Sequence, residues 1–291
     1  MFDRSRLALL LALAGCNQIY GLDPTRLDDT PASDLDRDGI ADDDDPCIAP
    51  MRDGDDDLDE DGVVARDDRC PFSASTLDDD ADGIPDECDP FPKALGDTLA
   101  CYMSFGSTEI NGLVWTPRDA TMDWTSREGE LYTRVAGPVS GVVATLDFVA
   151  GAQTTFEAAI SLDNASPSGI FAFRLWGRAG MTASEQDIGC EISGDASSTR
   201  VAVVRGNDND QAAVTELQPF PKSRLLRLRL VLGEATGTAN VRCELLDWLQ
   251  STPTARAQIA LPPGRVAFGT ENLQAHVSAF AIYTRASPAA L

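Results

Sequence analysis

Three copies of one acidic pattern lie in the first third of this sequence, and each has the spacing of a loop that folds around a metal ion. In the first copy, aspartates stand at offsets 0, 2 and 4, glycine at 5, and further aspartates at 8 and 11, counted from Asp34. The same offsets recur from Asp57 and from Asp78, except that Ala65 replaces the aspartate at offset 8 of the second copy. Carboxylates at alternate positions, followed by a glycine that permits a sharp turn, are typical of a Ca²⁺ loop.

Each copy supplies enough oxygen atoms to bind a hard cation. Calcium takes about 6–8 oxygen ligands, which the aspartates and the backbone carbonyl after each glycine can provide. Magnesium requires a tighter octahedron and fits a flexible carboxylate loop less well. Ala65 predicts weaker binding by the second half of its copy, unless Asp67 substitutes. The predicted ligands are Asp34, Asp36, Asp38, Ile40, Asp42, Asp45, Asp57, Asp59, Asp61, Val63, Asp68, Asp78, Asp80, Asp82, Ile84, Asp86 and Asp89.

Most of the negative charge of the chain lies in this tract. Residues 28–89 hold 25 acidic and 4 basic side chains, whereas all 291 residues together have a net charge of -24. Such a tract repels nucleic acid and anionic lipid, and it stays expanded unless cations neutralise it. The alternative interpretation is a disordered acidic linker. A linker of that kind would rarely place Gly39, Gly62 and Gly83 at the same offset.

The N-terminus has the features of an export signal. A basic start precedes a short apolar run, residues 7–13, which is too short to span a bilayer. The run ends in Leu-Ala-Gly-Cys, up to Cys16, which resembles the bacterial lipobox. The resemblance implies cleavage before Cys16 and acyl chains on that residue, and two or more chains give durable anchoring. An ordinary secretory signal with a chance cysteine is the alternative. We therefore expect a lipid-anchored protein of the cell envelope, at the outer membrane or the cell surface.

Six cysteines remain once Cys16 is set aside, and an even number in an exported chain predicts disulfides. A zinc site is the alternative, but the paired short spacings of zinc ligands are missing, and the single histidine, His276, excludes a histidine-rich site. Proximity and the repeat structure favour the pairs Cys47–Cys70, Cys88–Cys101 and Cys190–Cys243.

The acidic copies overlap in spacing with an EF-hand, but prolines and further aspartates stand where the flanking helices would be. Residues 34–42 and 78–86 instead resemble the thrombospondin type 3 repeat, in which aspartates and Asp-Gly precede Cys-Pro. Cys70-Pro71 matches that ending, whereas Pro46-Cys47 reverses it. The resemblance covers about 60 residues and implies a calcium-wrapped array over residues 34–92 whose core is ions and disulfides.

The rest of the chain has the composition of strands. Over residues 224–232, leucines alternate with other residues, so that Arg227 and Arg229 face away from the leucine side. No convincing amphipathic helix is present, and many short strands separated by turn-forming residues predict an all-β sandwich. Further strands are expected at 141–148, 154–162, 169–176, 200–205, 240–246, 258–261, 265–269 and 275–284.

The end of this region resembles a known class of sandwich. Residues 264–272 and 275–283 are similar to the last strands of concanavalin-like or laminin-G-like jelly rolls, and residues 169–174 to an inner strand of that class. The resemblance implies a lectin-like fold that binds glycans or proteins and in some members hydrolyses polysaccharides, and fold alone does not decide between these. The expected organisation is a signal peptide (1–15), a tether (16–33), the calcium array (34–92) and the sandwich (99–286).

No catalytic motif stands out. Glycosidases of this fold place carboxylates at alternate positions of one strand, and the nearest segment, residues 185–189, has Gly189 at the third position. Glu185 and Asp187 are therefore expected to be solvated loop charges. His276 is interpreted as a strand residue near the surface, and the four tryptophans as buried residues rather than a sugar-stacking platform.

Three classes of function remain. The first is adhesion or binding of a glycan or a cell-surface protein, which the lectin-like resemblance and the missing catalytic motif favour. The second is polysaccharide hydrolysis by a site without a recognised motif. The third is a structural role in the envelope. Nothing basic and clustered suggests a nucleic-acid partner.

Overall fold

The protein is described here by a computed structural model. The residues that the structure describes are 57–64, 67–105, 115–118, 124–127, 130–133, 140–144, 153–165, 170–179, 187–195, 197–206, 210–217, 224–233, 239–247, 252–259 and 265–285. All of them belong to one compact unit that spans residues 46–291. The expected signal, the tether and the first acidic copy lie outside the described residues. Among the described residues there is no helix long and apolar enough to cross a membrane.

Strands form all of the regular secondary structure in the described part of the chain. They are β1 (Asp97–Ser104), β2 (Trp115–Pro117), β3 (Trp124–Arg127), β4 (Glu130–Thr133), β5 (Ser140–Ala144), β6 (Gln153–Ala165), β7 (Phe171–Ala179), β8 (Ile188–Gly194), β9 (Thr199–Arg205), β10 (Asp210–Leu217), β11 (Leu225–Leu232), β12 (Ala239–Leu246), β13 (Thr254–Ile259), β14 (Arg265–Glu271) and β15 (Leu273–Arg285).

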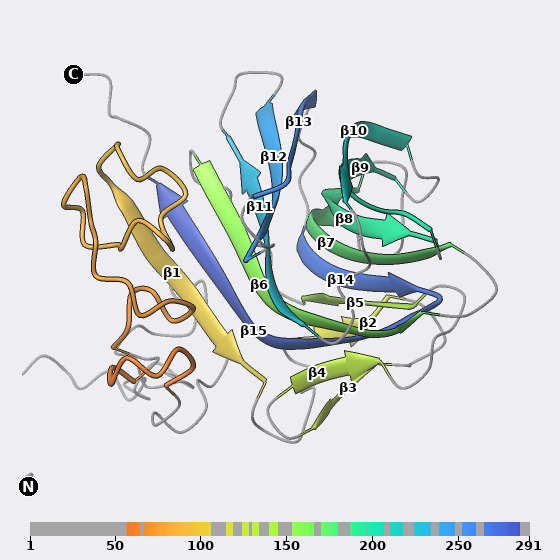
Figure 1. Cartoon of the computed structure of the whole chain (residues 1–291), viewed down its shortest axis with the longest axis horizontal. Coiled ribbons are helices and arrows are strands. Elements are labelled where there is room, and N and C mark those ends of the chain that lie inside the picture. Colours follow the sequence, from red (N-terminus) through yellow and green to blue (C-terminus); the bar gives the residue numbers. More distant parts are fainter. Residues whose placement is uncertain are drawn as a thin grey trace, which may run out of the picture. The chain divides into compact units, whose positions relative to one another are not determined.

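These strands pair into two antiparallel sheets (Figure 1). The first has eight strands in the order β13-β12-β11-β6-β15-β4-β3, with β1 paired to β15. The second has seven in the order β10-β9-β8-β7-β14-β5-β2. The chain crosses between the sheets at several points, for example from β6 to β7 and from β14 to β15. Two antiparallel sheets joined by such crossings form a jelly-roll sandwich, which confirms the predicted all-β class.

The core lies between the two sheets. The alternating leucines of β11 supply one side of it: Leu226, Leu228 and Leu230 are fully buried there. Phe268 of β14 packs edge-on against Phe280 of β15, with ring centroids 5.6 Å apart. The disulfide between Cys190 in β8 and Cys243 in β12 links the sheets, as predicted.

Strand positions follow the sequence pattern where the pattern is long. The expected strands 200–205 and 240–246 correspond to β9 and β12, whereas the strand expected at 258–261 is the end of β13 and stops at Ile259. The pattern did not indicate β1, β2, β3, β4, β8 or β10. For β8 the reason is that the strand is buried on both faces, so its polarity does not alternate.

The described part of the acidic tract packs on the outer face of the first sheet, at β1 and β15. We call residues 57–96 the repeat segment; it contains the second loop (residues 57–68) and the third loop (residues 78–89). Ile84 of the third loop is buried against Tyr102 of β1 and Tyr283 of β15. Figure 1 shows the repeat segment running along β1. The sequence predicted a calcium array separate from the sandwich, with a core of ions and disulfides, and its described part instead packs on the sandwich.

Two of the three predicted disulfide pairs are wrong. Cys70 is bonded to Cys88, because the third loop brings their Cα atoms to 5.3 Å. Cys101 cannot reach Cys88, since it belongs to the core between the sheets whereas Cys88 lies on the outer face. Cys101 is itself disulfide-bonded, to a partner outside the described residues. Cys47 also lies outside them.

Candidate calcium site

The second and third loops have the same backbone turn. At offset 3, Glu60 and Ala81 both have a φ of 62°. At offset 5, Gly62 and Gly83 have φ values of 92° and 94°. These angles lie in the left-handed region, which glycine enters readily and other residues rarely do. The repeated sequence is therefore a repeated conformation.

The first aspartate of each loop closes that turn. Gly62 N–H donates to Asp57 Oδ2 over 2.8 Å, and Asp61 N–H donates to Asp57 Oδ1 over 3.1 Å. In the third loop, Gly83 N–H donates to Asp78 Oδ2 over 2.9 Å. These hydrogen bonds fix the carboxylates at the places where a cation would be held.

Alternate aspartates converge in both loops. Ligand oxygens of Asp57, Asp59 and Asp61 lie within 4.8 Å of one another. Oxygens bound to one calcium ion at about 2.4 Å are at most about 4.8 Å apart, so the spacing suits a single ion. The third loop has the same arrangement in Asp78, Asp80 and Asp82.

A third group of carboxylates joins the repeat segment to the sandwich. We call it the bridging cluster: oxygens of Asp82, Asp89 and Asp97 lie within 4.8 Å of one another. Asp97 is the first residue of β1 and was not predicted as a ligand, because it stands outside the third copy. Its backbone N–H and that of Gly96 donate to Asp82 Oδ2 over 2.8 and 3.0 Å.

Two of the three residues of the bridging cluster, Asp89 and Asp97, are buried, whereas Asp82 is partly exposed. Asp89 and Asp97 are each only 2% exposed. Their Oδ2 atoms have no hydrogen-bond partner among the residues that the structure describes. Buried carboxylate oxygens normally have partners, and these two atoms are free to bind a cation.

Burial and mutual repulsion raise the pKa of several of these carboxyls. Burial raises the pKa of Asp89 to about 7, and the charges of Asp97 and Asp82 add to the effect. Burial also raises the pKa of Asp97 to about 6, although Arg285 opposes the shift. The pKa of Asp68, the closing aspartate of the second loop, rises to about 6 by burial and by nearby aspartates.

The size of the repulsion shows why a cation matters. Two unit charges 4.8 Å apart repel by about 3 kcal/mol at an effective dielectric constant of about 20. Each cluster contains three such pairs when all of its carboxyls are ionised. A bound divalent cation would replace this repulsion by attraction.

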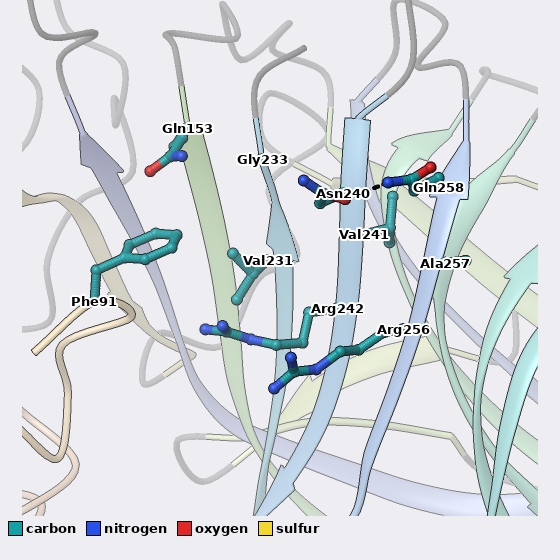
Figure 2. Close-up of a pocket in the computed structure, with 10 residues that line it drawn as sticks. All are labelled: Phe91, Gln153, Val231, Gly233, Asn240, Val241, Arg242, Arg256, Ala257 and Gln258. Atoms are coloured by element: carbon teal, nitrogen blue, oxygen red, sulfur yellow. Dashed lines mark hydrogen bonds between the residues drawn. The ribbon is translucent and has the colours of Figure 1, made fainter.

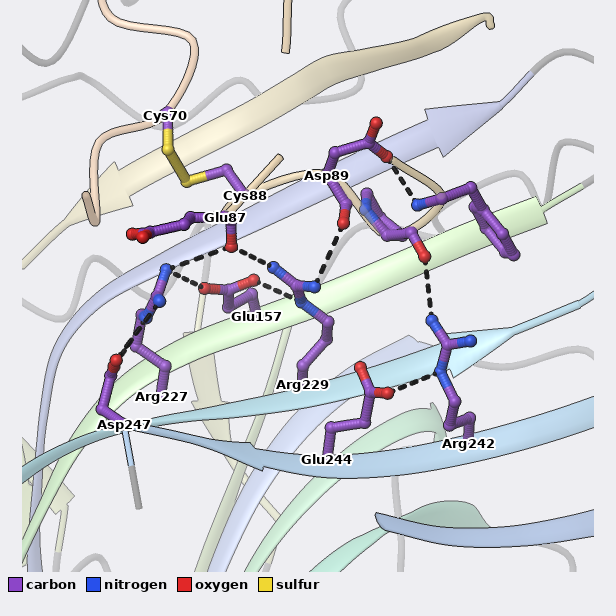
Figure 3. Close-up of polar contacts among 12 residues, drawn as sticks. Cys70, Glu87, Cys88, Asp89, Glu157, Arg227, Arg229, Arg242, Glu244 and Asp247 are labelled. Carbon is purple, nitrogen blue, oxygen red and sulfur yellow. Dashed lines mark hydrogen bonds and ion pairs between the residues drawn. A yellow bond between two sulfur atoms is a disulfide. The ribbon is translucent and has the colours of Figure 1, made fainter. Parts of the chain in front are cut away.

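Arginines of the first sheet hold the segment that carries Asp89 (Figure 3). Arg229 donates to the carbonyls of Glu87 and Asp89 over 2.9 and 3.3 Å. Arg242 donates to the carbonyl of Pro90 over 2.9 Å. Below them Glu157, which is fully buried, pairs with Arg229 through Nε over 2.7 Å. The predicted outward direction of Arg229 is confirmed, but this side chain is buried under the repeat segment.

A polar hollow of about 590 Å³ lies beside the repeat segment on the outer face of β11, β12 and β13. Figure 2 shows Arg242 and Arg256 extending across the sheet toward the side where Phe91 stands. Arg242 lies over the Phe91 ring, with its guanidinium carbon 5.5 Å from the ring centroid. The lining residues are Phe91, Gln153, Val231, Gly233, Asn240, Val241, Arg242, Arg256, Ala257 and Gln258.

Two arginines, Arg242 and Arg256, line the hollow, although the chain as a whole has a net negative charge. Burial lowers the pKa of Arg242, and the charges of Arg229 and Arg256 lower it further, although Glu244 opposes them. Arg256 is exposed, and it has no ion pair within the part of the chain that the structure describes. An anionic group would therefore be attracted to this end of the hollow.

The residues considered for catalysis have structural partners. Asp187 was expected to be solvated, but it is buried and paired with Arg118. His276 is a residue of β15, as predicted; its ring contacts Glu130 at 2.6 Å and Asp163 at 2.8 Å. Glu185 lies outside the described residues.

The described tryptophans agree with the buried interpretation. Trp124 and Trp176 are 6% and 2% exposed. The side chains of Trp115 and Trp248 lie outside the described part. The predicted calcium ligands Asp34, Asp36, Asp38, Ile40, Asp42 and Asp45 also lie outside it, as does the predicted lipidation site Cys16.

Known structures resemble this protein in fold, but no sequence family matches it. No protein-family model and no curated protein matches the sequence. Peanut lectin is 12% identical, with a TM-score of 0.45, and the match covers 62% of this chain and 96% of that one. An endo-1,3-β-glucanase from Streptomyces sioyaensis is 10% identical, with a TM-score of 0.47 and coverage of 66% and 98%.

A carbohydrate-binding module from Bacillus subtilis is 16% identical, with a TM-score of 0.36, and covers 58% of this chain and 96% of its own length. Similarity at this level assigns no ligand and no activity to this chain.

Proposed function

We propose that this protein is a calcium-binding, lipid-anchored protein of the cell envelope whose sandwich presents a binding surface for a glycan or a cell-surface protein. The observation that carries the proposal is the pair of matching aspartate triads in the second and third loops. Calcium is the cation best suited to them, because it accepts many carboxylate and carbonyl oxygens at flexible distances. Extracellular calcium modules bind at about 10⁻⁴–10⁻³ M, and we expect affinities in that range.

Calcium would act here on structure rather than on chemistry. The aspartates of the loops would hold the ions. Arg229, which pairs with Glu157, would hold the end of the third loop through the carbonyls of Glu87 and Asp89. With its charge neutralised in this way, the repeat segment would pack stably on β1 and β15. Without the ions, repulsion between its aspartates would weaken that packing. Lipid on Cys16 would keep this assembly at the outer membrane or the cell surface.

Calcium titration of the full chain in detergent, followed by calorimetry, tests the calcium part of the proposal. We expect several bound ions, and we expect Asp80→Asn to lose binding in the third loop. Asp79→Asn is the matched control, because Asp79 is its exposed neighbour and the change removes the same charge. Absence of heat and of bound ion at millimolar calcium would contradict the proposal.

Membrane fractionation tests the anchor. The Cys16→Ser variant is expected in the soluble fraction, because it lacks the thiol to which lipid would be attached. The unchanged chain is expected in the membrane fraction. Retention of the variant in membranes would show that a different segment holds the protein there.

The polar hollow is the surface at which we expect the ligand. Arginine and amide donors suit a saccharide that carries carboxylates, since arginine pairs well with carboxylate. Calorimetry with tetragalacturonate, against neutral maltotetraose, is the direct test. Arg256→Gln should weaken binding at least about tenfold, a loss of about 1.4 kcal/mol.

Arg205→Gln is the control for that experiment, because Arg205 is an exposed arginine on β9 of the other sheet. Equal binding by Arg256→Gln and Arg205→Gln would exclude the hollow as the site. Equal binding of the two oligosaccharides would remove the role of the carboxylates.

A further inference from the structure

We propose that the bridging cluster of Asp82, Asp89 and Asp97 is a separate calcium site, in which the sandwich itself supplies a ligand and the ion fastens the repeat segment to β1. This inference rests on the proposed calcium binding and adds to it a ligand outside the repeats. Asp97 is absent from the repeat pattern, and the ion it would bind is distinct from those of the two loops.

The geometry places two carboxylates of the third loop and one of the sandwich around one point. Asp82 comes from the third loop, Asp89 from its end and Asp97 from the start of β1. Their oxygens lie within 4.8 Å of one another, which is the spread that one calcium ion allows. Asp82 also belongs to the triad of the third loop, so it would be shared by two neighbouring ions.

The unpartnered oxygens give the second, independent indication of a ligand. Oδ2 of Asp89 and Oδ2 of Asp97 are buried and have no hydrogen-bond partner among the described residues. Each of the two residues is only 2% exposed. A buried carboxylate oxygen without a donor is costly, and a directly bound cation is the group that would satisfy two such atoms at once.

Compensating positive charge from the protein is small. Arg285 is the cation that acts on Asp97, whereas Asp82 and Asp80 place like charges beside it. The Arg285 guanidinium is also engaged elsewhere, donating to the carbonyl of Leu95 over 3.1 Å. When all three carboxyls are ionised, one arginine leaves the site with a net negative charge, which a cation from solution would balance.

An ion in the bridging cluster would also affect the polar hollow, because Asp89 contacts a residue that lines it. Asp89 Oδ1 accepts the Phe91 N–H over 2.5 Å, and the Phe91 ring lines the polar hollow. The Phe91 ring lies 5.2 Å from the guanidinium carbon of Arg285 as well. The bridging ion would thus order the wall of the hollow through the side chain of Asp89.

The test compares Asp97→Asn with the unchanged full chain in two conditions. Asn keeps the shape of the side chain and removes its charge. In EDTA the variant is expected to unfold at a higher urea concentration than the unchanged chain, because one repulsive charge is gone. In 5 mM CaCl₂ the order is expected to reverse, because the variant lacks one ion. Elemental analysis after dialysis should count one calcium fewer per chain.

Asp79→Asn is the control. It should bind as many calcium ions as the unchanged chain, and its stability relative to the unchanged chain should not reverse between EDTA and CaCl₂. Asp89→Asn is the second variant, and it should show the same reversal as Asp97→Asn even if one of the two folds poorly. An unchanged count and no reversal in both variants, with calcium still bound by the parent chain, would overturn the bridging site alone. A parent chain without bound calcium would overturn the proposed function itself.

Discussion

Gly83 forms the sharp turn of the third loop at a φ of 94°. A Cβ built there would lie 2.3 Å from Arg69 Nη1, the far end of a flexible side chain that can move away. The cost of a side chain at this position is therefore mainly that of the left-handed backbone. The sequence predicted this residue correctly, because glycine recurs at one offset in all three copies.

Gly83→Ala should lower the free energy of unfolding by about 1–2 kcal/mol, the usual cost of the left-handed conformation for a residue with a Cβ. Gly62→Ala should cost a similar amount, since its φ is 92° and nothing lies within 4 Å of the added atom. Urea unfolding in calcium measures both. Stability equal to that of the unchanged chain in both variants would mean that the loops do not hold this turn.

The titration of the buried aspartates gives a second prediction at this scale. The pKa values of Asp68, Asp89 and Asp97 are about 6, about 7 and about 6, above the ordinary value of 3.8. A raised pKa means that the folded, ion-free chain binds protons more tightly than the unfolded chain. The resulting stabilisation is complete below about pH 4 and is lost as the pH rises through 6 and 7.

In EDTA, thermal unfolding should therefore occur at a higher temperature at pH 5 than at pH 8. Saturating calcium should remove this difference, because the ion binds the deprotonated form. A midpoint in EDTA that rises from pH 5 to pH 8 would contradict these assignments. The measurement needs the same ionic strength at both pH values, since salt screens the repulsion.

At the scale of the element, β11 shows what a strand pattern reveals and what it conceals. The alternation of leucine with arginine predicted the strand and the direction of its apolar face. It gave no indication that Arg227 and Arg229 are buried, at 7% and 5% exposure, because the segment that covers them is far away in the sequence. Polar residues on a strand face indicate water only when no other part of the chain lies on that face.

Replacing Arg229 by methionine should destabilise the fold by about 3–5 kcal/mol, because it removes a partner of the fully buried Glu157. The double variant Arg229→Met, Glu157→Gln should recover part of the loss. Arg256→Met is the control, since Arg256 is exposed on the same sheet. Equal losses in the Arg229 single and double variants would mean that the ion pair is not the cause.

At the scale of the whole molecule, the described part of the repeat segment packs on the sandwich, so that the two form one compact unit rather than two separate domains. The sequence predicted both parts and the spacing of the ligands within each loop. It did not predict their contact, since Asp97, Tyr102 and Tyr283 lie outside the repeats and meet them only in the fold. The pairing of Cys70 with Cys88 was missed for the same reason, because chain proximity does not reveal which face of β1 a cysteine occupies.

Hydrogen exchange of the full chain, followed by mass spectrometry in calcium and in EDTA, tests most directly whether calcium folds the repeat segment onto the sandwich. We predict that calcium slows exchange across residues 57–97 and in β1 and β15, the two strands on which the repeat segment packs. Exchange in β8 and β9 of the other sheet should change little. Identical exchange of residues 57–97 in the two conditions would contradict the account.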